Sequence, residues 1–142
     1  MTIARLIAGR STEVWSIEAD DTVADAVAML ASKRIGALPV RDGGPHVVGI
    51  FSERDVLYCL QTRGAEMLTL KVREVMTAPA ITIDPSTRVD EALALMTRRR
   101  IRHLPVEQDG AVIGFVSIGD LVKYRIDTIQ AEAEALRSYI AS

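Results

Sequence analysis

Two stretches of the chain carry the same pattern of residues that could bind a phosphorylated ligand. The pattern is Gly-x-x-Ser-x-x-Asp, and it occurs at residues 49–55 and 114–120. Each copy ends a β-prone run and opens a helical one, so free backbone amides and the positive end of a helix dipole are available to a phosphate. Asp55 and Asp120, one turn into their helices, could each accept two hydrogen bonds from a vicinal diol. A phosphate beside a diol describes a ribonucleotide.

The same spacing also has a purely structural interpretation. Ser52-x-x-Asp55 and Ser117-x-x-Asp120 are capping boxes, in which each side chain satisfies a backbone amide at the start of its helix. Spacing alone favours capping, so the binding interpretation depends on what faces these residues.

Most of the chain is duplicated. Residues 17–40 align with 83–106, and residues 47–57 align with 112–122 after a loop one residue shorter. These 35 aligned positions contain 13 identities, against roughly two or three expected from average residue usage. A unit of this size buries too little apolar surface alone, so we expect the two copies to pack together about a pseudo-twofold axis.

Each copy predicts the order β-α-β-β-α, which makes the fold class α+β. The first helix of each copy is expected to begin near Thr22 or Thr87, because each threonine precedes an acidic residue by three positions. Pro39 and Pro105 predict an edge or a strand start, since proline cannot donate to a ladder. The expected strands are 14–17, 37–40 and 47–52 in the first copy, and 80–83, 103–106 and 111–117 in the second.

The predicted organisation is a first repeat with its lead-in helix at 2–62, a linker at 63–71, a second repeat with its lead-in helix at 72–126, and a C-terminal helix at 127–142. Apolar residues from Ile126 to Ile140 recur at steps of three and four, which places one stripe on the last helix. We expect the stripe to pack back on its own domain, with a dimer or partner contact as the alternative.

Composition argues against several classes of function. Seventeen Lys and Arg against 19 Asp and Glu give a net charge of −2, so no overall basic field attracts nucleic acid or an anionic membrane. The basic run at 98–103 could neutralise phosphates, but Arg98 and Arg99 are expected instead to cover the solvent side of a helix end, where cations complement the dipole. No apolar run is long enough to span a membrane. The single cysteine forms no internal disulfide, and together these features predict a cytoplasmic protein.

Enzymatic and metal-binding candidates are few, so we predict neither a catalytic nor a metal site. Cys59 lies in an apolar helical run and is expected to be a small buried side chain. His46, in a Gly-Pro loop, is expected to be solvated. Trp15 is expected to anchor the core or a dimer, with stacking on a base as the alternative.

The duplicated motifs, with Arg-Ile-x-x-Leu-Pro-Val preceding Val-x-Gly-x-x-Ser-x-x-Asp in both copies, resemble a tandem pair of CBS domains, the regulatory module named after cystathionine β-synthase. The resemblance covers residues 2–125. The chain is also similar in length to stand-alone CBS-pair proteins. It implies a homodimeric disc of two pairs, with clefts between repeats that bind adenosine-containing ligands. AMP is the leading expectation, and ATP, ADP, NAD(H) or S-adenosylmethionine are alternatives.

The resemblance also implies that each cleft is shared, one repeat lining the base and the other holding ribose and phosphate. Carried onto this sequence, the first cleft takes Ser16, Ile17, Ile35, Gly36, Ala37 and Pro39 with Ser117 and Asp120. The second takes Thr82, Ile83, Ile101, Arg102, His103 and Pro105 with Ser52, Arg54 and Asp55.

The two implied clefts differ in charge. Gly36 and Ala37 are small and neutral, whereas Arg102 and His103 suit phosphate. We therefore expect the second cleft to prefer more phosphorylated ligands. The predicted function is energy or redox sensing by conformational change. A dimerisation module without a ligand is the alternative, followed by a nucleic-acid-binding protein.

Overall fold

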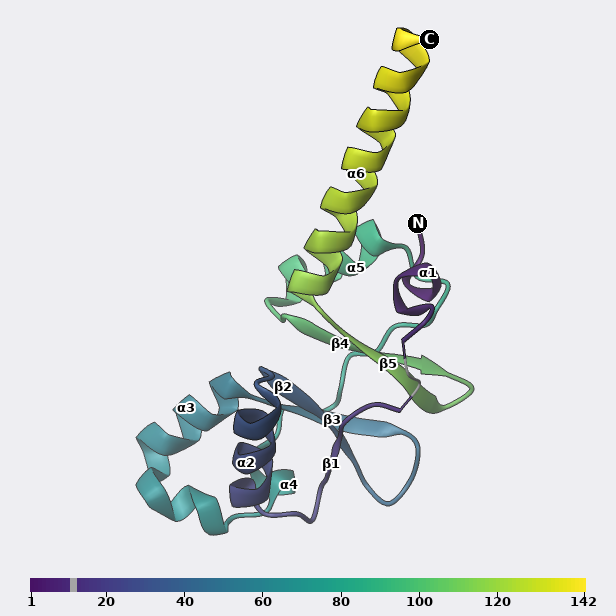
Figure 1. The fold of residues 1–142 in the computed structure, drawn as a ribbon. Coiled ribbons are helices and arrows are strands. Elements are labelled where there is room, and N and C mark those ends of the chain that lie inside the picture. Colours follow the sequence, from purple (N-terminus) through teal and green to yellow (C-terminus); the bar gives the residue numbers. More distant parts are fainter. Residues whose placement is uncertain (11–12) are drawn as a thin grey trace.

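The computed structural model describes residues 1–10 and 13–142, and these form two stacked α+β halves. One half is built on a three-stranded sheet and the other on a two-stranded sheet. Figure 1 shows the last helix projecting away from both halves. The first half holds β1 (Ile17–Glu18), α2 (Val23–Lys33), β2 (Ala37–Arg41), β3 (Val47–Ser52), α3 (Glu53–Arg63), the 3-10 helix η1 (Gly64–Thr69) and α4 (Val72–Val75). The second holds α1 (Ile3–Ile7), α5 (Val89–Arg99), β4 (His103–Gln108), β5 (Ala111–Ser117) and α6 (Ile118–Ala141).

The predicted hairpins and helices are confirmed, whereas the leading strands are shorter than predicted. β1 starts at Ile17 and pairs in parallel with the end of β2. In the second copy the equivalent pairing shrinks to one parallel bridge, Ile83 with Val106. The predicted strands at 14–17 and 80–83 are therefore wrong in extent, because the backbone before Ile17 and Ile83 runs along the clefts described below.

The prolines lie inside strands rather than at their starts. Pro39 pairs with Ile50 in the middle strand of the order β1-β2-β3. This is tolerated because β1 covers only Val40 and Arg41 of β2, so the position without an N–H faces no neighbouring strand.

Helix starts follow the prediction in one copy and shift in the other. Thr22 caps α2 by accepting a hydrogen bond from the Asp25 amide at 3.2 Å. In the second copy the helix begins one residue later than predicted, with Arg88 as N-cap and the Glu91 carboxylate accepting from the Arg88 amide at 3.2 Å. Thr87 instead uses its carbonyl to accept from the Ile3 amide at 2.8 Å.

The two lead-in helices are exchanged between the halves. Ile3 and Leu6 of α1 are buried in the same core cluster as residues of α5 and β4, so α1 packs on the second repeat. Val72 of α4 is buried in the core of the first repeat, beside Val23. The hydrogen bonds are symmetric, since the Ile3 amide donates to Thr87 as the Val72 amide donates to Asp21. The chain is therefore interlaced, although the repeats are consecutive in sequence.

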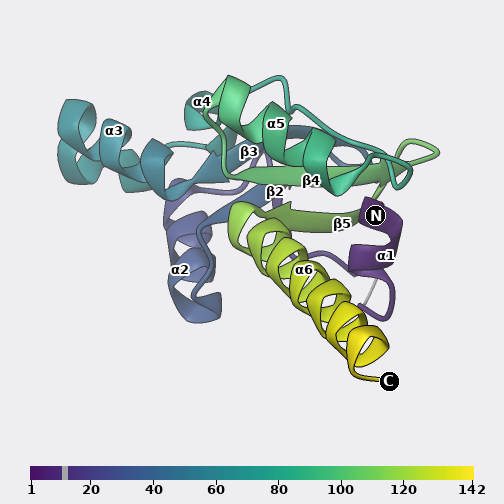
Figure 2. The same ribbon diagram turned by 90° about the horizontal axis from the view of Figure 1, so that it is seen from above.

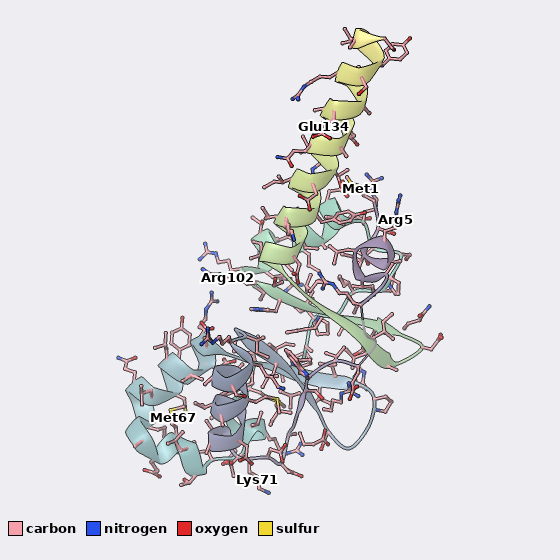
Figure 3. The ribbon with its side chains drawn as sticks, in the orientation of Figure 1. Met1, Arg5, Met67, Lys71, Arg102 and Glu134 are labelled. Atoms are coloured by element: carbon pink, nitrogen blue, oxygen red, sulfur yellow. The ribbon has the colours of Figure 1, made fainter. Side chains whose placement is uncertain are left out.

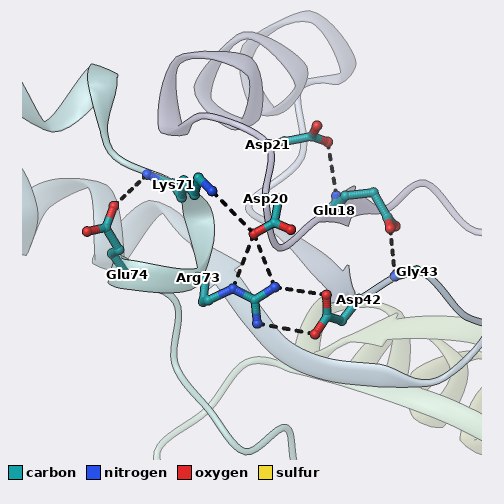
Figure 4. A network of polar contacts seen from close by, with 8 residues as sticks. All are labelled: Glu18, Asp20, Asp21, Asp42, Gly43, Lys71, Arg73 and Glu74. Carbon is teal, nitrogen blue, oxygen red and sulfur yellow. Dashed lines mark hydrogen bonds and ion pairs between the residues drawn. The ribbon is translucent and has the colours of Figure 1, made fainter.

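A polar network fixes α4 to the first repeat. The Arg73 guanidinium lies between two carboxylates, 3.1 Å from Asp20 and 2.9 Å from Asp42, as Figure 4 shows. The hydrogen bonds and charge of Arg73 lower the pKa of the Asp42 carboxyl below its ordinary value. All three groups are solvated, so the network fixes the orientation of α4 and adds little to the stability of the core.

The predicted linker and tail both differ from the sequence expectation. Residues 64–69 form η1, whose Met67 is buried in the first core. The second helix of repeat two does not end near residue 126 but continues as α6 to Ala141. Figure 2 shows α6 leaving the body as one straight helix. Ile126, Leu136 and Ile140 are exposed, so the expectation that the stripe packs back on its own domain is wrong.

Gly49 of β3 permits a close contact with the segment after α4. An added Cβ would lie 2.7 Å from Met76 Sδ and 2.9 Å from the Thr77 carbonyl oxygen. Because that carbonyl accepts from the Ile50 amide, Gly49→Ala should strain this pairing and lower the free energy of unfolding by about 1–3 kcal/mol. Denaturant unfolding measures the loss.

The duplicated position supplies the control. A Cβ on Gly114 would meet nothing nearer than Ile7 at 3.4 Å, an ordinary contact. Gly114→Ala should therefore leave stability nearly unchanged. Equal losses in the two variants would contradict the steric argument for Gly49.

Candidate functional site

Two clefts lie where the repeats face each other. The first has a volume of about 520 Å³ and the second about 640 Å³, and both fall within the usual size range of small-molecule sites. Gly36 and His103 line both clefts, so these residues form the wall between them. Figure 3 shows this inter-repeat zone, with the labelled Arg102 at its edge near the start of β4.

The first cleft takes residues from both repeats. Its floor comes from the turn between α2 and β2, and its other side from β5 and the start of α6. Its lining is Ile7, Arg10, Glu13, Val14, Trp15, Arg34, Ile35, Gly36, Ala37, His103, Ile113, Gly114, Phe115, Ser117 and Asp120.

The second cleft is its pseudo-symmetric counterpart. It is formed by the turn between α5 and β4 together with β3 and the start of α3. Its lining is Gly36, Ile50, Ser52, Glu53, Arg54, Asp55, Leu57, Tyr58, Thr77, Pro79, Ala80, Ile81, Arg99, Arg100, Ile101, Arg102 and His103.

Asp120 both caps a helix and lines the first cleft. Its Oδ2 accepts from the Ser117 amide at 2.9 Å, while the Ser117 hydroxyl accepts from the Asp120 amide at 3.1 Å. The other oxygen, Oδ1, lies 3.4 Å from the Arg10 guanidinium. The capping box therefore uses one oxygen and fixes the carboxylate, while the second oxygen lies beside Arg10, which also lines the cleft.

Asp55 has the same arrangement in the second cleft. Its Oδ2 accepts from the Ser52 amide at 2.9 Å, and its Oδ1 accepts from the Thr77 hydroxyl at 3.0 Å. Thr77 takes the place that Arg10 holds in the first cleft, so the partner of the outer oxygen is neutral here. The structural and the binding interpretations of the motif are therefore compatible.

Most of the predicted residues lie in the clefts to which they were assigned. Ile35, Gly36, Ala37, Ser117 and Asp120 line the first cleft. Ser52, Arg54, Asp55, Ile101, Arg102 and His103 line the second.

Six predicted residues line neither of these clefts: Ser16, Ile17, Pro39, Thr82, Ile83 and Pro105. Ile17 and Ile83 are core residues, and both prolines are buried within their strands. At the leading strands, the residues that line the clefts lie about two positions earlier in the sequence than the predicted ones. They are Val14 and Trp15 in the first cleft, and Ala80 and Ile81 in the second. The sequence already indicated this difference. Ile17 and Ile83 are apolar residues that a core buries, and a side chain buried in the core cannot also line a cleft.

Other lining residues had no signal in the repeat alignment. Arg10 and Ile7 reach the first cleft because α1 crosses to the second repeat. Thr77 reaches Asp55 by the equivalent crossing of the segment after α4. Only the exchange of the lead-in segments brings these residues to the site.

His103 is held between the clefts by stacking. Its ring lies 5.5 Å from that of Phe115, nearly parallel to it. Burial lowers the pKa of the imidazole below its ordinary value, and the nearby charges of Glu53 and Asp120 oppose this shift only in part. The position between the clefts therefore favours the neutral form of the imidazole.

The burial of His103 predicts how the free energy of unfolding depends on pH. A lowered folded-state pKa means that the unfolded chain binds more protons, so this contribution to stability is present above the unfolded value of about 6.5 and falls as the pH drops below it. His103→Gln should flatten the dependence of the unfolding midpoint on pH between 7.5 and 5.5. His46→Gln is the matched control, because the His46 side chain is 64% exposed and its Nδ1 lies 3.2 Å from the Glu107 carboxylate, far from the wall between the clefts. An unchanged slope in His103→Gln would contradict the prediction.

Arginines distinguish the two clefts. The second is lined by Arg54, Arg99, Arg100 and Arg102, and the first by Arg10 and Arg34. Three arginines of the basic run at 98–103 thus line the second cleft, including Arg99, for which the sequence predicted helix-end coverage. The Arg54 guanidinium donates to the Arg100 carbonyl at 3.2 Å, which joins the two repeats across the cleft.

Cys59 and Trp15, two residues that the sequence analysis singled out, lie in different environments. Cys59 is buried, as predicted. Trp15 is 53% exposed and lies under the Lys33 ammonium at 4.8 Å, so a role as a core anchor is wrong. Within residues 1–10 and 13–142, no group of three His, Cys, Asp or Glu side chains is arranged to hold a metal ion.

This architecture, two interlaced repeats with one cleft on each side of their contact, is that of a tandem pair of small domains. The chain belongs to the CBS-domain family, whose model matches it twice, at residues 8–62 and 72–127.

Individual relatives agree with this assignment. The mitochondrial CBS domain-containing protein CBSX3 of Arabidopsis thaliana is 41% identical over 85% of this chain, which spans 61% of that relative's length. A CBS-domain structure from Burkholderia ambifaria is 40% identical with a TM-score of 0.81, covering 89% of this chain and 95% of that one. CBSX2, solved in complex with AMP, is 26% identical with a TM-score of 0.76, covering 89% of this chain and 97% of that one. Among the described residues, no helix is both long and apolar enough to cross a lipid bilayer.

Proposed function

We propose that this protein is a regulatory module that binds adenine nucleotides in the two inter-repeat clefts, with AMP as the leading ligand. The observation that carries the proposal is the pair Asp55 and Asp120. Each has one oxygen fixed by its own capping box and the other on a cleft lined by the opposite repeat. A ribose diol is the ligand group that such a fixed acceptor suits. The AMP complex of CBSX2 supports the same ligand class.

The two clefts are proposed to prefer ligands with different numbers of phosphate groups. Four arginines in the second cleft against two in the first favour a ligand with more phosphate groups, such as ATP, in the second. The first cleft, with Gly36, Ala37 and the exposed ring of Trp15, suits AMP or the dinucleotide NAD(H). Trp15 then serves as a stacking surface for the base.

The proposed output is a change in the relative orientation of the repeats. A ligand that contacts both repeats binds best to one orientation, so occupancy shifts the population of that state. A homodimer of pairs and a further protein that reads the orientation complete the proposal. The single buried cysteine supports a reducing, cytoplasmic setting.

Titration tests the proposal against a dimerisation module without a ligand. AMP, ATP and NADH are added separately to the purified protein, and binding is followed by calorimetry and by Trp15 fluorescence. Small molecules released by denaturation are identified by mass spectrometry. We expect AMP to saturate at least one cleft per chain and ATP to favour the second. Absence of binding at millimolar nucleotide, with no nucleotide released, would leave the dimerisation alternative.

A further inference from the structure

The projecting end of α6 presents an apolar seam that the body of the molecule does not cover. The seam consists of Ile126, Ile129, Ala133, Leu136 and Ile140, spaced alternately by three and four residues. Ile126 and Ile129 are about half exposed, and Leu136 and Ile140 are 60% and 75% exposed. Glu134, labelled in Figure 3, marks how far this part of the helix stands from both repeats.

The seam faces away from the side of α6 that packs on its own domain. Leu121 and Tyr124 face the second core, and at 100° per residue their mean direction lies about 130° around the helix axis from that of the seam. The body therefore cannot cover the seam without rotating α6 out of its core. The family match ends at residue 127, so most of the seam also lies beyond the repeats that define the family.

The projecting part of α6 lacks the packing that usually stabilises a helix. It rises about 24 Å from Ile126 to Ala141, and most helical stability in proteins comes from burying an apolar face rather than from propensity. The alternation of three and four places Ile126, Ala133 and Ile140 at a positions of a heptad, and Ile129 and Leu136 at d positions. Two helices that pack along this stripe bury residues with this spacing.

Flanking charges select a second copy of the same helix in parallel orientation. With this heptad, Glu132 falls at a g position and Arg137 at the following e position. In a parallel pair, g of one helix lies beside e of the next heptad on the other, so Glu132 meets the Arg137 of the second copy, twice by symmetry. We propose that residues 126–140 of two chains form a parallel coiled coil that joins two CBS pairs. This interaction does not depend on a bound nucleotide.

Cysteine cross-linking tests orientation and face together. In a Cys59→Ala background, Leu136→Cys places a thiol at a d position, where parallel helices bring the two Cα atoms within disulfide range. Ser138→Cys places a thiol at the outer f position of the same helix. In a glutathione redox buffer we expect covalent dimers from Leu136→Cys and few from Ser138→Cys. Failure of Leu136→Cys to cross-link, or equal cross-linking by both, would overturn the proposal.

Charge reversal tests the second copy without any cysteine change. Glu132→Arg and Arg137→Glu each place like charges at both flanking pairs, and each should weaken the association by roughly tenfold. The double variant restores opposite charges and should restore both the association and the helical circular dichroism of the C-terminal segment. Association is read from the temperature at which that helical signal is lost, because weaker pairing melts the C-terminal helices earlier even where the two chains are also held together through other surfaces. Single and double variants with the same behaviour would contradict the parallel pairing.

Discussion

Replacing Asp120 with alanine is expected to weaken AMP binding in the first cleft on the order of 10- to 100-fold. The change removes the carboxylate oxygen that faces the cleft, and a charge-assisted pair of hydrogen bonds is worth roughly 1.5–3 kcal/mol. It also frees Arg10, which lies 3.4 Å from that carboxylate. Calorimetric titration of wild type and variant gives the ratio of dissociation constants. Asp55→Ala should act in the same way on the second cleft, leaving the first nearly unchanged.

A control is needed because Asp120 also caps α6. Glu91 accepts from the Arg88 amide at the start of α5, so Glu91→Ala removes a comparable cap, and Glu91 lines neither inter-repeat cleft. It should lower stability without changing nucleotide affinity. If Asp120→Ala binds AMP as tightly as Glu91→Ala does, the carboxylate serves only its helix, and the assignment of a ribose to this position fails.

Ile3→Ala is expected to destabilise the second repeat, although Ile3 precedes the first in sequence. The side chain is fully buried among residues of α5 and β4, so truncation leaves a cavity and should cost about 2–5 kcal/mol. Denaturant unfolding measures the cost. Hydrogen exchange on the folded variant should show that protection falls more in residues 83–125 than in residues 17–62.

The exposed neighbour Arg5 supplies the control on the same helix. Arg5→Ala keeps the helix and removes no buried surface, so it should change the free energy of unfolding by less than about 0.5 kcal/mol. A loss of protection in Ile3→Ala that falls mainly on residues 17–62 would show that α1 does not belong to the second core.

Much of the local structure follows from the sequence. The duplication, both hairpins, the apolar helix faces and the two capping boxes are encoded by short-range spacing, which fixes backbone hydrogen bonds within a few residues. The resemblance to CBS pairs added the cleft positions that these spacings could not supply. The cleft linings include Trp15 and Ile81 rather than Ser16 and Thr82, because a resemblance fixes the order of residues but not where a strand begins.

Tertiary structure decided how the repeats share their parts. Whether α1 packs on its own repeat or on the other cannot be read from an apolar pattern, since Ile3 and Leu6 are equally apolar toward either core. The same exchange brings Arg10 to Asp120 and Thr77 to Asp55, which surround the proposed ligand groups. The exposed seam of α6 has a similar origin. Its period was visible in the sequence, but only the direction of Leu121 and Tyr124 shows that the seam faces away from the domain's own core.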